Sequence, residues 1–157
     1  MIASPAVVSA ASTLAGRPVT VVCNRDQSFD AGELGYTLAE NGVVYPTIYL
    51  PASTCNRLNN LAAPQLVVVD KRPSRVIVSA AALAIDLPDG SAVDTLVHEA
   101  THILEQSTDE ARVECDSYTN RAAAVAQFPL SAKQAARVMR GVIATHENSD
   151  PSYLTIC

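Results

Sequence analysis

Short apolar runs separated by polar turns and prolines divide the chain into candidate helices and strands. Apolar residues at helical spacing predict a helix over 6–15, and a β-branched run predicts a strand over 18–23. Two further runs, 36–40 and 43–50, flank Asn41-Gly42, the dipeptide most typical of a two-residue hairpin turn. Pro46 cannot donate to a ladder, so the strand over 43–50 is expected at a sheet edge or with a bulge there. An edge at 43–50 could also pair with an extended peptide.

The rest of the chain is expected to be mostly helical. Leu87-Pro88-Asp89-Gly90 predicts a break, and Ser91 followed by Asp94 resembles a capping box that would start the next helix. The predicted elements are a helix from the Ser53 cap through Leu61, a hairpin of 66–70 with 75–79, helices from about Ala92, from about 109 to 127, and from the Ser131 cap over 132 to about 145, and a polar tail over 146–157.

The helix expected from about Ala92 carries the sequence His98-Glu99-Ala100-Thr101-His102. Residues four apart lie on one helical face, so both imidazoles can reach a Zn²⁺ ion at about 2.0–2.1 Å. Glu99 is about 100° further round the helix and can face the metal without binding it. A carboxylate in that position can take a proton from a zinc-bound water. The alternative is that two of the three histidines fall four apart by chance and share only a surface.

A third ligand is expected downstream, where Glu110, Glu114 and Asp116 are the candidates. If one helix ends near Gln106 and the next begins near Thr108, the two run antiparallel across a short turn. The metal would then lie about six residues, or roughly 9 Å, back from that turn. The same distance along the second helix reaches Glu114. We therefore predict Glu114 as the ligand, with Glu110 as the alternative and Asp116 on a different face.

The residues from Ser91 to Tyr118 resemble the zincin metallopeptidases with an HExxH motif, most of all the small gluzincins. This resemblance implies an α+β, zincin-like domain in which a small, mostly antiparallel sheet packs on the HExxH helix and a following ligand helix. It also implies a Zn²⁺ cofactor, a peptide or protein substrate, and peptide-bond hydrolysis with Glu99 as the general base. A zincin-like module that binds zinc or a partner without catalysis is the alternative.

Gluzincins usually have an Asp or Asn four residues after the ligand Glu, where it holds a ligand histidine. Tyr118 follows Glu114 at that distance, whereas Glu114 itself follows Glu110, so the family spacing fits Glu110 better. Some gluzincins use a distant histidine to stabilise the oxyanion, but His146 is more simply interpreted as a solvated residue at a helix end. Tyr118 is either an ordinary core tyrosine or a residue that reaches the site.

Composition sets limits on the other classes of function. The 157 residues correspond to one domain, 1–157, and no apolar run approaches the roughly 20 residues of a membrane span. With a net charge of −5 and scattered basic residues, neither nucleic acid nor an anionic membrane is an expected partner. The oligomeric state stays open.

The four cysteines form no C-x-x-C motif, and their even number suggests two disulfides. We predict Cys23–Cys55, which would join a core strand to a helix, and Cys115–Cys157, which would anchor the tail. Disulfides would imply a secreted or exported protein, although residues 1–5 do not resemble a signal peptide. The alternative is four free, buried thiols in a cytoplasmic protein.

Overall fold

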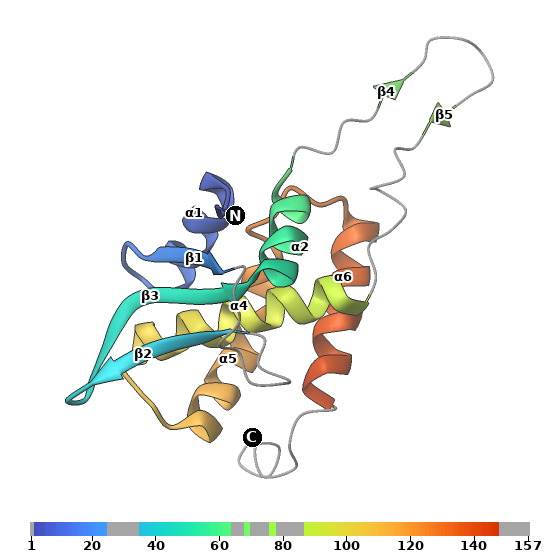
Figure 1. Cartoon of the computed structure of the whole chain (residues 1–157). Helices are drawn as coiled ribbons and strands as arrows, with labels where there is room; N and C mark the ends of the chain where they lie inside the picture. Colours follow the sequence, from blue (N-terminus) through green and yellow to red (C-terminus); the bar gives the residue numbers. More distant parts are fainter. Residues whose placement is uncertain (1, 25–34, 64–67, 70–75, 78–86, 148–157) are drawn as a thin grey trace.

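The computed structural model describes residues 2–24, 35–63, 68–69, 76–77 and 87–147, which form an α+β structure (Figure 1). The predicted α+β class is therefore confirmed, but the main sheet is mixed and not mostly antiparallel as predicted. The described elements are α1 (Pro5–Leu14), β1 (Thr20–Asn24), β2 (Tyr36–Glu40), β3 (Val43–Pro51), α2 (Ala52–Ala62), β4 (Val68–Val69), β5 (Val76–Ile77), α4 (Leu87–Glu105), α5 (Glu110–Val125) and α6 (Ala132–Glu147).

The main sheet has the strand order β1-β3-β2, with β1 parallel and β2 antiparallel to β3. The edge position expected for 43–50 is wrong, because β1 pairs with β3 from Thr47 onward, on the side opposite β2. The bulge is confirmed: the register between β2 and β3 shifts across the segment that contains Pro46. Among the described strands, β2 is the edge strand on the other side of β3. Asn41 and Gly42 form the predicted turn, with φ values of +52° and +78°.

Helix α4 begins at Leu87, five residues earlier than expected, so the predicted break at 87–90 and the capping box are both wrong. Pro88 is tolerated because the first turn of a helix has no use for its missing N–H. Gly90 is required by a distant contact. A Cβ atom there would lie 2.4 Å from both the carbonyl carbon of Gly141 and the backbone nitrogen of Val142, so α4 and α6 cross with their backbones almost touching.

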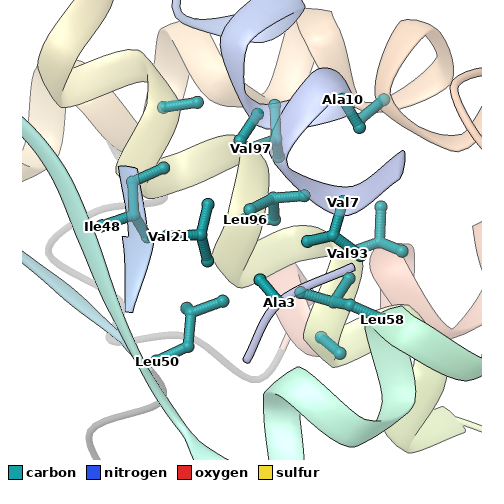
Figure 2. Close-up of a cluster of buried hydrophobic side chains, with 14 of the residues drawn as sticks. Ala3, Val7, Ala10, Val21, Ile48, Leu50, Leu58, Val93, Leu96 and Val97 are labelled. Atoms are coloured by element: carbon teal, nitrogen blue, oxygen red, sulfur yellow. The ribbon is translucent and has the colours of Figure 1, made fainter. Parts of the chain in front are cut away.

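Apolar side chains of α4 form the centre of the core, which Figure 2 shows. Val93, Leu96 and Val97 are buried against side chains from α1, the sheet and α2. Their labelled neighbours are Ala3, Val7, Ala10, Val21, Ile48, Leu50 and Leu58. Each such side chain contributes about 1.5–3 kcal/mol when it is fully buried. Helix α4 is thus held on several sides, and its polar face has a fixed position.

The starts of the last two helices agree with the sequence analysis. The Asp109 side chain accepts a hydrogen bond from the backbone N–H of Arg112, and Ser131 and Gln134 cap each other reciprocally. The Ser53 cap is wrong, because Pro51 occupies that position and makes no side-chain cap.

The Cys23–Cys55 disulfide is confirmed and joins β1 to α2 with a Cα separation of 5.9 Å. No cysteine within the described ranges is free, but the predicted partner of Cys115, Cys157, lies outside them. The second hairpin is confirmed where it is described, since β4 and β5 pair antiparallel; the rest of 66–79 lies outside the described residues. No helix in the described part is long and apolar enough to cross a membrane.

Candidate metal centre

Three potential ligands converge where α4 meets the first turn of α5. The Nε2 atoms of His98 and His102 are 3.1 Å apart, and the Oε2 atom of Glu110 lies 3.1 Å from the first and 3.4 Å from the second. Among the described residues, these three side chains form a group that could hold a metal ion. The four-residue spacing of the histidines produces this convergence, because it places both rings on one helical face.

Hydrogen bonds on the far side of each ring fix how the histidines face this point. The Nδ1 atom of His102 is 2.8 Å from the carbonyl oxygen of Ser107, and that of His98 is 2.9 Å from Oε2 of Glu114. Both partners are acceptors, so each Nδ1 carries a proton, and the Nε2 lone pair of either ring, when that ring is neutral, would face the site. Two lone pairs and a carboxylate oxygen cannot crowd together favourably unless positive charge lies between them.

The acids around the histidines favour that positive charge. Burial lowers the pKa of His98, but hydrogen bonds to Glu110 and Glu114 and the charge of Glu99 outweigh it and raise the pKa to about 10. Hydrogen bonds from His102 and His98 in turn hold the pKa of Glu110 well below its usual range. Without a metal ion, protons would take the place of the cation.

Glu114 lies behind His98 rather than in the group of three. Its Oε2 accepts from Nδ1 of His98, while its Oε1 accepts from Nη2 of Arg121 at 2.8 Å and from Nδ1 of His146 at 2.7 Å. Which carboxylate binds metal stays a prediction, but this geometry favours Glu110 over Glu114.

The turn between the two helices explains the difference from the antiparallel estimate. The chain turns at Gln106, whose φ is +53°, and then folds back along α4, so that the Ser107 carbonyl reaches Nδ1 of His102. Helix α5 therefore begins level with the motif, about one turn earlier than a symmetric connection would place it. Glu110 is brought to the position expected for Glu114.

Glu99 is 5% exposed and lies beside His98, with which it lines two cavities. One, of about 220 Å³, also borders Thr95 and Thr145. The other, of about 360 Å³, runs past His102 and Glu110 along β2. Glu99 thus lies next to a candidate ligand and borders space that a substrate could occupy.

Gly35 borders both cavities and lies directly over α4. A Cβ atom on it would come within 2.7 Å of Cγ2 of Thr95, 2.9 Å of Cδ2 of Leu50 and 3.3 Å of Cγ of Glu99. This role of Gly35 could not be predicted from the sequence, because a glycine beside a polar loop gives no sign of a distant close approach.

The structure gives defined positions to His146 and Tyr118, for each of which the sequence allowed two interpretations. His146 belongs to α6 and its side chain is only 12% exposed, so the solvated interpretation is wrong. Tyr118 is 45% exposed, which excludes an ordinary core tyrosine, and its ring contacts His146 and the guanidinium of Arg121 at 4.5 and 4.7 Å.

Asp94 and Arg121 are further residues of the site that the sequence analysis missed. Arg121 lies seven residues after Glu114 and is therefore on the same helical face, a spacing that could have pointed to it. Asp94 precedes His98 by four residues and was assigned to a helix cap instead.

No protein-family model, curated protein or solved structure matches this chain. Function is therefore inferred from the geometry and chemistry of the residues themselves.

Proposed function

We propose that this protein is a zinc metallopeptidase with a zincin-like fold, in which His98, His102 and Glu110 bind Zn²⁺ and Glu99 is the general base. The observation that carries the proposal is the convergence of the three ligand atoms, with Glu99 beside them. Glu110 replaces Glu114 as the expected third ligand.

The ligand distances support zinc in particular. Bonds of about 2.0–2.1 Å at tetrahedral angles place ligand atoms about 3.3–3.4 Å apart. The three pairs here are 3.1, 3.1 and 3.4 Å apart, so a small shift outward would fit the ion. Two neutral imidazoles and one carboxylate also form a donor set typical of catalytic zinc, which keeps a position open.

Zn²⁺ held by these residues would supply a Lewis acid that polarises the substrate carbonyl and makes water easier to deprotonate. Glu99 would accept the proton from the attacking water and donate it to the leaving amine. The position of Glu99 on the cavity wall beside His98 supports this role.

The free edge of β2 supports a peptide substrate. Tyr36, Thr37 and Ala39 of this strand line the larger cavity together with His98 and Glu110. An extended peptide could pair with an open strand edge while one of its carbonyls lies over the site. Because Cys23–Cys55 is bonded, we also propose that the protein works outside the reducing cytosol.

The test is zinc content and peptide turnover measured on the same preparations. We expect the parent to bind one zinc and to cleave members of a broad peptide panel. Glu99→Gln should retain zinc and lose about 10²–10⁴-fold or more in rate, because the proton acceptor is gone. Glu105→Gln is the matched control: its carboxylate lies on the same helix but pairs with Arg112 and is not one of the three proposed ligands.

Two results would contradict the proposal. Zinc-loaded parent protein that cleaves nothing would favour the module that binds zinc or a partner without catalysis. Equal turnover by the parent and by Glu99→Gln would show that another group acts as the base.

A further inference from the structure

Among the described residues, Arg121 has the largest side chain that is almost completely enclosed, with 2% of its surface exposed. Its Nε donates a hydrogen bond to Oδ1 of Asp94, and its Nη2 donates to Oε1 of Glu114 at 2.8 Å. Asp94 and Glu114 are themselves buried, with 6% of each residue exposed. A guanidinium thus joins two carboxylates in the interior.

The stability of the folded protein does not explain why three charged side chains are buried here. Removing a guanidinium and two carboxylates from water carries a large desolvation cost, and well-packed apolar side chains can fill such a place with equal or better stability. The Nη1 atom of Arg121 is also buried without a hydrogen-bond partner in the described structure, which adds to that cost. What Arg121 holds gives another reason for its presence.

Arg121 connects the two helices through a series of side-chain contacts. Helix α4 contributes Asp94 and, one turn later, His98; helix α5 contributes Glu114 and, two turns later, Arg121. The connections run from Asp94 to Arg121, from Arg121 to Glu114, and from Glu114 to Nδ1 of His98. The orientation of the His98 ring therefore depends on Arg121 through one intermediate carboxylate.

We propose that Arg121 is a positioning residue of the metal centre: it holds the Glu114 carboxylate so that Oε2 accepts from Nδ1 of His98 and Nε2 of His98 faces the metal. This inference rests on the proposed zinc site. The planar guanidinium suits the role, because two of its nitrogens donate to two acids in fixed directions, whereas the ammonium of lysine is a point charge whose donors rotate. The Tyr118 ring over the guanidinium further restricts its movement.

The experiment compares Arg121→Met, Arg121→Lys and the parent by three measurements. These are zinc affinity by chelator competition, the visible spectrum of the Co²⁺-substituted protein, and thermal unfolding in EDTA. We expect both variants to bind zinc about 10–100-fold more weakly, as is typical when a partner of a ligand histidine is disturbed. The Co²⁺ spectrum should change as well, since the His98 ring is no longer held in one orientation.

Arg112→Met is the matched control. Arg112 lies on the same helix and also contacts two carboxylates, Glu105 and Asp116, but it is 65% exposed and has no link to His98. The zinc affinity and the Co²⁺ spectrum of the Arg112→Met protein should match those of the parent.

Unchanged zinc affinity and an unchanged Co²⁺ spectrum, with only the EDTA unfolding temperature lowered, would assign Arg121 a purely structural role and overturn the inference. If Arg121→Met does not fold, Arg121→Lys decides, because it keeps the buried charge. Failure of the parent to bind zinc would reject the proposed site, and this inference with it. A parent that binds zinc beside variants that bind it equally well would reject the inference alone.

Discussion

Gly90 lies where α4 and α6 cross, and replacing it with alanine should destabilise the protein although alanine is the better helix former. An added Cβ would be 2.4 Å from the carbonyl carbon of Gly141 and from the nitrogen of Val142. Ordinary contacts begin near 3.4 Å, so the helices would have to separate by roughly 1 Å. Both neighbours are backbone atoms and cannot rotate away.

The expected change in the free energy of unfolding follows from two opposing effects. Alanine in place of glycine stabilises a helix interior by up to about 1 kcal/mol, and less in a first turn. Overpacking a well-filled core typically costs about 1–3 kcal/mol, and here the buried Val138 and Val142 of α6 would have to move as well. The net change is a loss of about 1–2 kcal/mol, which in a chain of 157 residues lowers Tm by about 2–8 °C.

Thermal unfolding measured by circular dichroism tests this, with Ser91→Ala as the matched control. Ser91 is the next residue in α4 and is partly exposed, so alanine there should leave Tm unchanged or raise it slightly. A Gly90→Ala protein that is as stable as Ser91→Ala, or more so, would show that the two helices do not cross at this distance.

Three further predictions concern the metal centre and the disulfide. Glu110→Ala should lose bound zinc on dialysis while Glu114→Ala retains part of it, measured by metal analysis; the opposite order would restore Glu114 as the ligand. Changing Cys23 and Cys55 to serine should lower the free energy of unfolding by about 4 kcal/mol in the loop-entropy model, since 32 residues separate them; urea denaturation of both forms checks this. In the metal-free protein, burial raises the pKa of Glu114, but its hydrogen bonds, led by that from His98, lower it to about 2. The stabilisation from this carboxylate should therefore be complete above pH 4.5 and lost as the pH falls from 4.5 to about 2. The difference in Tm between the parent and Glu114→Gln, measured in EDTA, should shrink over that range. A constant difference would contradict the prediction.

Local chemistry in the sequence was sufficient for several elements. Asn41-Gly42 specified the hairpin because both residues adopt positive φ readily, and Asp109 and Ser131 marked helix starts because their side chains cap nearby N–H groups. The facing imidazoles of His98 and His102 follow from the helical period alone. Each of these features depends on atoms only a few residues apart.

Tertiary structure decided the features that depend on distant partners. Strand β3 is central because β1 pairs with it in parallel, and Gly90, in the first turn of α4, meets Gly141 across the fold. Neither contact leaves a local pattern in the sequence, because each is formed by residues far apart along the chain.

The candidate site divides in the same way. The α4 residues of the motif could be predicted, but the choice between Glu110 and Glu114 depended on how 106–109 folds back along α4. Arg121 and His146 reach Glu114 from separate turns and helices, and their roles depend on that convergence. Helical spacing fixes which side chains share a face, whereas the packing of one helix on another fixes which faces meet.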